Sequence, residues 1–134
     1  MRTKLLPLGS LAYVWAGLIL LLPWWTEYAS AQDRRHFSGI AAFYSADYRG
    51  NTACGDRYDP AKFTAAHRTL PFGTRVRVTD PKSRRTVVVV VNDRGPFTKG
   101  RVLDLSMAAA KALHMIGHGL IRITAEVEGP SAFR

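Results

Sequence analysis

The feature that most constrains this chain is a run of six residues, Thr86 to Val91, that are all branched at Cβ. Such side chains are stiff in a helix and pack well on a pleated sheet. The run therefore predicts a strand. Because large apolar side chains stand on both of its sides, it predicts a strand that is buried on both faces. The run leads directly into the loop sequence NDRGP at 92–96.

Shorter segments predict further strands. Residues 121–128 alternate apolar and polar side chains, and residues 75–79 do the same, which is the pattern of a half-buried strand. Residues 39–45 and 102–105 are also strand candidates. Many short strands with few helices predict a mainly β fold, namely a small β-barrel.

One or two short helices are expected beside these strands. Residues 61–70 could form one helical turn before the proline and glycine that follow them. Ser106 is a suitable N-cap for a helix over 107–113. Gly117 and Gly119 would end that helix.

The N-terminal residues have the parts of a secretory signal peptide. A basic start precedes the apolar residues 11–22, and Ala29 and Ala31 stand where a signal peptidase reads small residues. We therefore expect residues 1–31 to be cleaved near Ala31, leaving a soluble, exported protein in the periplasm. An uncleaved membrane anchor is the alternative. It needs about 20 apolar residues, and Glu27 follows too soon.

This interpretation sets the expected domain organisation. Residues 32–38 form a short polar lead, residues 39–129 form one domain, and residues 130–134 form a tail. No cysteine lies near the cleavage site, so we expect no lipid anchor. We expect the product to be a monomer.

The charge of the chain indicates the class of partner. It carries 19 Lys and Arg against 10 Asp and Glu, a net charge of +9. Cleavage would remove Arg2, Lys4 and Glu27, which leaves 17 basic and 9 acidic residues. A basic surface favours nucleic acid, anionic membrane or an acidic cell-wall polymer. Export argues against nucleic acid and favours peptidoglycan, whose lactyl-peptide groups carry carboxylates.

Metal and thiol chemistry have little support in the sequence. The single cysteine, Cys54, excludes an internal disulfide and a cluster of Cys ligands. His114 and His118 have the spacing of a metal pair on a helix, but Gly117 interrupts it and no acidic residue stands nearby. We therefore expect no metal and no cofactor. As a nucleophile Cys54 would need a base such as His67, and a half-buried filler is the simpler interpretation.

The carboxylates are better candidates for catalysis. Asp93 follows the valine run, so an apolar strand would bring its carboxyl group to the mouth of a loop. Partial burial there would favour the protonated form, which suits a general acid. The alternative is that Asp93 only pairs with Arg94 or caps the loop. Asp56 and His67 are weaker candidates, since Gly-Asp in a loop is common turn chemistry.

Three stretches of the chain read GIAAFYS, TACGDRYDPAKFTAAHRTLPFGTRVRVTD and VNDRGPFTKGRVLDLSMAAAKAL. Through them, residues 39–128 resemble the double-psi β-barrel domain of rare lipoprotein A, that is, the RlpA-like lytic transglycosylases. The resemblance implies a six-stranded double-psi β-barrel under a shallow groove. It also implies cleavage of peptidoglycan strands between N-acetylmuramic acid and N-acetylglucosamine, leaving 1,6-anhydro-N-acetylmuramic ends.

The resemblance also implies site residues. Asp93 matches the essential Asp of the family, and His67 matches a His of its active groove. Asp56 stands where active members usually have Glu. The side chain is one methylene shorter, and a misplacement of about 1 Å can cost about a hundredfold in rate, so we expect weak activity. Tyr44 and Arg94 are the candidate substrate-binding residues.

The reaction implied by the resemblance needs no water. One carboxyl group, here Asp93, protonates the glycosidic oxygen and then takes a proton from the C6 hydroxyl as it closes on C1. A hydrolase remains an alternative, with Asp56 and Asp93 about 6.5–9.5 Å apart around a water molecule.

A non-catalytic glycan binder is the other alternative. Plant expansins share the barrel and loosen walls without cutting them, and the basic charge and Tyr44, Tyr48 and Tyr58 would suit that role. The chain stops just past the barrel, without the glycan-binding SPOR domain of many family members. We therefore do not expect recruitment to division sites.

Overall fold

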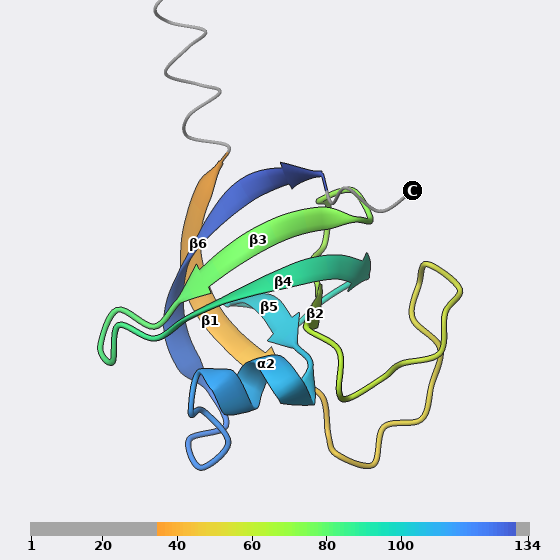
Figure 1. Ribbon diagram of the computed structural model, residues 1–134, viewed down its shortest axis with the longest axis horizontal. Helices are drawn as coiled ribbons and strands as arrows, with labels where there is room; N and C mark the ends of the chain where they lie inside the picture. Colours follow the sequence, from red (N-terminus) through yellow and green to blue (C-terminus); the bar gives the residue numbers. More distant parts are fainter. Residues whose placement is uncertain (1–34, 131–134) are drawn as a thin grey trace, which may run out of the picture.

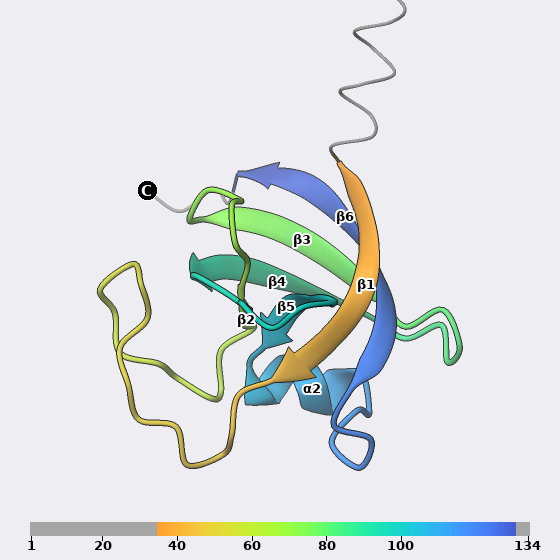
Figure 2. The same ribbon diagram turned by 180° about the vertical axis from the view of Figure 1, so that it is seen from behind.

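A computed structural model describes residues 35–130 of the chain. These residues form a closed barrel of six strands with one short helix packed against it (Figures 1 and 2). The elements in chain order are β1 (His36–Phe43), β2 (Thr64–Ala66), β3 (Thr74–Thr79), β4 (Thr86–Asp93), β5 (Arg101–Leu105), α2 (Met107–Ala112) and β6 (Ile121–Pro130). The mainly β barrel that the sequence predicts is confirmed.

Around the barrel the strands follow the order β1-β5-β2-β4-β3-β6. The pairs β1–β5 and β2–β4 are parallel, and the other four neighbouring pairs are antiparallel. Strands adjacent in space are therefore often distant in the chain. Loops from separate parts of the sequence meet as a result at the ends of the barrel.

The valine run lies in β4, but only one of its faces is fully buried. Val89 and Val91 are completely buried in the barrel core, whereas Val88 and Val90 are half-buried on the outside. The expectation of burial on both faces is therefore wrong. In a small closed barrel alternate side chains fill the interior and the others face outward. The strand also continues to Asp93, which shares the inward side with Val91.

The segment 61–70 contains a strand and not the expected helical turn. Ala65 and Ala66 pair with β4 on one side and β5 on the other, and both are buried. The hydrogen bonds and burial that the barrel offers this segment outweigh the local helix preference of alanine. Similarly, β1 begins at His36 and not at residue 39, because residues 36–38 pair with β6.

The helix begins as expected and ends early. Ser106 caps α2 by accepting a hydrogen bond from the backbone N–H of Ala109. The helix ends at Ala112, with Leu113 as its C-cap, several residues before Gly117 and Gly119. These glycines therefore lie in the turn that leads to β6 and do not end the helix.

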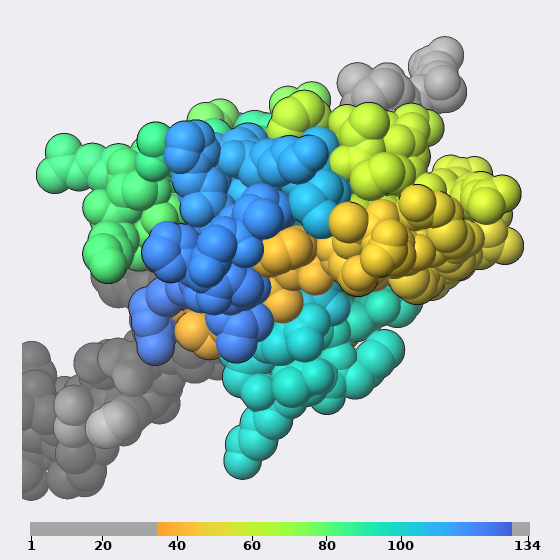
Figure 3. Space-filling view, turned by 90° about the horizontal axis from the view of Figure 1, so that it is seen from below, coloured from red at the N-terminus to blue at the C-terminus, as the bar shows by residue number. Residues whose placement is uncertain are grey.

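The loops 67–73 and 94–100 lie at the end of the barrel where β4 ends and β3 begins. The loop 44–63 joins the end of β1 to the start of β2 at the opposite end, and its residues Ala53 and Cys54 reach the end of β4 through hydrogen bonds to Asp93 and Asn92. Figure 1 shows loop 44–63 at the right of the molecule. The space-filling view shows this loop (yellow) and the β3–β4 hairpin (green) projecting at opposite ends of the molecule (Figure 3).

The expected signal peptide, its cleavage site and most of the expected tail lie outside the described residues. Within residues 35–130 no helix has the length and apolar character needed to span a bilayer.

Candidate active site

Asp93 is the last residue of β4, and its carboxyl group lies at the mouth of the barrel, 8% exposed. Its Oδ1 atom accepts hydrogen bonds from the backbone N–H groups of Ala53 and Arg94, each at 2.8 Å. Its Oδ2 atom accepts one from the hydroxyl of Tyr44 at 2.5 Å. Two backbone donors thus occupy Oδ1, and Oδ2 is the oxygen that a proton can reach.

These three donors are ones that stabilise a carboxylate. They offset the desolvation that burial imposes on the charged group. Because Ala53 and Tyr44 belong to the loop 44–63 and Arg94 begins the loop 94–100, the site forms only when these distant segments fold together.

The Tyr44 hydroxyl is held in its neutral form. Burial raises the pKa of Tyr44, and the hydrogen bond to Asp93 and the charges of Asp93 and Asp104 raise it further. The ring lies in an aromatic cluster with Tyr48 and Tyr58, at centroid distances of 5.3 and 4.9 Å. Tyr44 is therefore a fixed hydrogen-bond donor to the carboxylate. Contact of Tyr44 with a substrate stays a prediction.

His67 follows β2 and is joined to Asp93 through the backbone, because its N–H donates to the Asp93 carbonyl at 3.2 Å. Its Nδ1 atom accepts from the backbone N–H groups of Thr69 and Leu70 at 3.1 and 3.0 Å. The ring proton is therefore on Nε2. Burial lowers the pKa of His67, and nearby Arg68 and Arg94 lower it further. The ring is thus a neutral N–H donor.

Arg94 organises the loop 67–73. One guanidinium nitrogen donates to the carbonyl oxygens of Leu70 at 2.9 Å and His67 at 3.3 Å. The guanidinium also lies over the ring of Phe72, 3.9 Å from its centroid. Among the described residues no ion pair joins this guanidinium to Asp93, so the alternative of a simple pairing with Arg94 is not seen. The backbone N–H of Arg94 does donate to Asp93, as the loop-capping alternative expects. A contact of Arg94 with substrate stays a prediction.

Asp56 lies apart from this carboxylate. Its side chain is exposed, and its Oδ2 atom accepts from the Cys54 thiol at 3.6 Å. Within residues 35–130 no hydrogen bond joins Asp56 to Asp93. Asp56 instead lines a cavity of about 710 Å³ together with Phe63, Arg75 and Asn92. The thiol also lies 3.2 Å from the Thr52 hydroxyl, so Cys54 has polar neighbours but contacts neither Asp93 nor His67.

His114 and His118, which have the spacing of a metal-binding pair on a helix, do not share a helical face. Both His114 and His118 come after α2 has ended, and both are exposed. The described residues contain no group of three or more His, Cys, Asp or Glu side chains that could hold a metal ion.

The backbone N–H of Ala53 is a site feature that sequence reasoning missed. An alanine in a loop carries no chemical signal, and its donor reaches Asp93 only through folding. Asp104 was missed as well, although its charge acts on Tyr44. No sequence pattern links Asp104 to the site.

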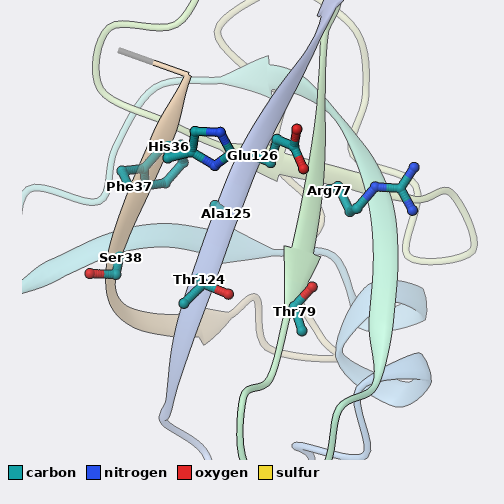
Figure 4. A pocket seen from close by; sticks show the side chains of 8 residues that line it. All are labelled: His36, Phe37, Ser38, Arg77, Thr79, Thr124, Ala125 and Glu126. Carbon is teal, nitrogen blue, oxygen red and sulfur yellow. The ribbon is translucent and has the colours of Figure 1, made fainter. Parts of the chain in front are cut away.

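A separate hollow of about 390 Å³ lies on the outer face of β1, β6 and β3 (Figure 4). Its lining residues are His36, Phe37, Ser38, Arg77, Thr79, Thr124, Ala125 and Glu126. Of these only Phe37 borders the candidate site, since its ring packs against His67 with centroids 5.1 Å apart. The hollow holds none of the expected catalytic residues.

Comparison with known families agrees with this arrangement. A family model described as "Lytic transglycolase" matches residues 36–125. The chain is a member of the RlpA-like double-psi β-barrel family. The six-stranded barrel and its closed topology are those that membership requires.

Two curated relatives show what share of a longer RlpA protein this RlpA-like barrel matches. The "Probable endolytic peptidoglycan transglycosylase RlpA" of Nostoc sp. is 56% identical over 102 residues, which cover 72% of this chain and 27% of that protein. The "Endolytic peptidoglycan transglycosylase RlpA" of Pasteurella multocida is 47% identical over 90 residues, covering 66% and 31%. The chain thus spans about a third of the length of these relatives.

A solved structure shares the barrel at lower identity. An expansin variant from Clavibacter michiganensis, in complex with cellohexaose, is 27% identical with a TM-score of 0.58. The match covers 74% of this chain and 53% of the expansin. The RlpA-like barrel is therefore similar both to proteins named as transglycosylases and to a protein solved with a bound glycan.

Proposed function

We propose that this protein is an endolytic peptidoglycan transglycosylase that cleaves the bond between N-acetylmuramic acid and N-acetylglucosamine and leaves 1,6-anhydro-N-acetylmuramic ends. The observation that carries the proposal is the buried Asp93 carboxyl group, with Oδ1 occupied by two backbone donors and Oδ2 facing Tyr44. The names of the curated relatives support the substrate class.

Asp93 acts twice in this proposal. In its protonated form it delivers the Oδ2 proton to the glycosidic oxygen, and the bond from that oxygen to C1 of the muramyl residue breaks. The carboxylate then takes the proton of the C6 hydroxyl as this oxygen bonds to C1. The proton lost in the first step is regained in the second, so the group returns to its starting state.

The surroundings of Asp93 suit this cycle. The two donors to Oδ1 fix the orientation of the carboxyl group, so that Oδ2 carries the proton. Tyr44 supports the carboxylate between the two steps, and its raised pKa keeps the phenol from losing its own proton. Burial of the carboxyl group limits access of water, which favours attack by the internal C6 hydroxyl.

His67 has a supporting role in the proposal. Its neutral ring presents the Nε2 proton to the groove as a hydrogen-bond donor for a sugar oxygen. Arg94 holds the loop 67–73 that carries this ring. Asp56 is not needed for either proton transfer, although it lies on the same side of the barrel.

The proposal includes the location and the partner. The N-terminal segment directs export to the periplasm, and the glycan strand is the polyanion that the basic chain meets there. Sequencing of the exported form tests the location, with Gln32 expected as its first residue.

A non-catalytic glycan binder is the second candidate, and the likeness to an expansin solved with cellohexaose favours it. The two candidates differ in their products. Purified denuded glycan strands are incubated with the protein and with its Asp93→Asn variant, and the products are separated by mass. We expect the parent to release anhydro ends and the variant to lose about 10²–10⁴-fold in rate while it still binds glycan.

Each product pattern decides between the candidates. Release at the parent rate by Asp93→Asn would remove Asp93 from the mechanism. Absence of any product from the parent would favour the binder. Reducing ends without the anhydro form would favour the two-carboxylate hydrolase.

A further inference from the structure

The loop 44–63 and the outer faces of β3 and β4 enclose a cavity that the proposed mechanism does not use. Its volume is about 710 Å³, within the range of about 300–1,000 Å³ that is usual for ligand pockets. Its lining includes Asp56, Lys62, Phe63, Arg75, Val90 and Asn92.

The cavity and the candidate active site meet at the end of β4. Asn92 lines the cavity, and the next residue, Asp93, carries the carboxyl group on the inward side of the strand. The loop 44–63 contacts both positions, because the N–H of Ala53 donates to Asp93 and the N–H of Cys54 donates to the carbonyl of Asn92 at 3.2 Å. A linear polymer bound at Asp93 would have to pass over the end of β4 to reach the cavity.

The apolar part of the cavity suits the face of a sugar ring. The side chain of Phe63 is 48% exposed, and its position is fixed because its carbonyl accepts from the N–H of Val90 at 3.0 Å. Val88 and Val90 are half-buried beside it. An exposed aromatic ring beside an apolar floor offers a stacking surface for the C–H face of a pyranose.

The polar part of the cavity suits an acidic substituent. Lys62 makes no ion pair with any residue of the described part of the chain. The guanidinium of Arg75 contacts Glu128 at 3.5 Å, and its side chain remains 45% exposed. Three cations, on Arg57, Lys62 and Arg75, thus line the cavity together with the two carboxylates of Asp56 and Asp59. The carboxylates and the Asn92 amide can bind hydroxyl and acetamido groups.

We propose that this cavity binds a carboxylate-bearing N-acetylhexosamine of the glycan strand, adjacent to the bond at Asp93. The inference rests on the proposed function for the identity of the strand. Phe63 lies under the sugar ring, and Lys62 and Arg75 bind the lactyl carboxylate. The cavity therefore distinguishes an acidic glycan from a neutral β-1,4-linked one.

Binding is measured by calorimetry with two soluble probes, denuded peptidoglycan strands and neutral chitohexaose. All variants are made in the full chain carrying Asp93→Asn, so that cleavage does not interfere. We expect Lys62→Gln/Arg75→Gln to weaken binding of denuded strands about tenfold or more and to leave chitohexaose binding unchanged. We expect Phe63→Ala to weaken both probes about fivefold, and Phe63→Trp to retain binding.

The matched control is Lys82→Gln/Arg85→Gln, which removes two charges from the exposed β3–β4 hairpin. An equal loss in this control would show that only net charge matters and would overturn the inference. So would parent-like binding by Phe63→Ala, or an equal loss of chitohexaose binding in the double variant. Melting temperatures of all variants establish that they are folded.

The proposed function is tested separately by the products of the chain with Asp93 intact. If that chain releases anhydro ends and the cavity variants bind like the parent, the inference fails alone. If it releases none but the cavity variants lose binding of the acidic strand, the proposed function fails and the binding site stands.

Discussion

The substitution Tyr44→Phe tests the hydrogen bond on which the proposed proton cycle depends. It removes the hydroxyl that donates to Asp93 Oδ2 at 2.5 Å, which is the one side-chain donor to this carboxylate among the described residues. A hydrogen bond to a charged group contributes about 1.5–3 kcal/mol. A change of about 1.36 kcal/mol corresponds to a factor of about ten in rate. Loss of the donor should therefore slow the step in which Asp93 gives up its proton by about tenfold to about a hundredfold.

The direction of the effect follows from the charge that the hydroxyl stabilises. Negative charge develops on Oδ2 as Asp93 gives its proton to the glycosidic oxygen, and Tyr44 donates to Oδ2. Without this donor the developing charge is less stabilised, so kcat should fall in Tyr44→Phe.

The assay is the initial rate of release of anhydro ends from denuded glycan at a fixed pH. Tyr48→Phe is the matched control. Its ring stacks on Tyr44 at 5.3 Å, and its hydroxyl donates to the Asn51 carbonyl at 3.3 Å and not to Asp93. If Tyr44→Phe kept the parent rate, or if Tyr48→Phe lost as much, the assigned role of Tyr44 would be refuted.

Three further substitutions test other parts of the site. Asp56→Glu, which restores the residue usual in the family, should leave the rate of anhydro-end release nearly unchanged, because both proton transfers are assigned to Asp93; a rise of about a hundredfold would show that this position takes part in catalysis. Cys54→Ser should leave rate and melting temperature nearly unchanged, because a hydroxyl can keep both contacts of the thiol; a loss of about a hundredfold at an unchanged melting temperature would indicate a chemical role. His67 has a pKa below its ordinary value of about 6.5, so the unfolded chain takes up its proton first as the pH falls. The parent should therefore lose stability below about pH 6.5, and His67→Asn should lack this part of the pH dependence in thermal unfolding; parallel curves for the two proteins would contradict the pKa assignment.

Much of the barrel could be predicted from local patterns. The alternation in β6 puts Ile123 and Ala125 in the core and Arg122 and Thr124 outside, as expected. The β3 strand follows the same rule, and Ser106 caps α2. These features depend on residues within a few positions of one another, so a short window of sequence contains the information.

The errors in the fold have a common cause. Residues 61–70 have a local preference for helix, yet Ala65 and Ala66 form a strand because β4 and β5 supply partners on both sides. The outer face of β4 is half-buried because the barrel closes around its other face. Neither outcome can be predicted from the segment alone, since each depends on what packs against the segment.

The sequence by itself determined which residue types were available to the site: a carboxylate after an apolar strand, a histidine after TAA, and the motifs that place the chain in its family. Only the tertiary structure decided how they act together. Two of the donors to Asp93 are far from it in the chain: Ala53 lies 40 positions away and Tyr44 lies 49 positions away. Ala53 contributes only its backbone N–H. Asp56 was brought to a neighbouring cavity and not to Asp93. The physical reason is that strand periodicity is a local property, whereas the meeting of loops at the mouth of the barrel depends on pairing strands that are distant in sequence.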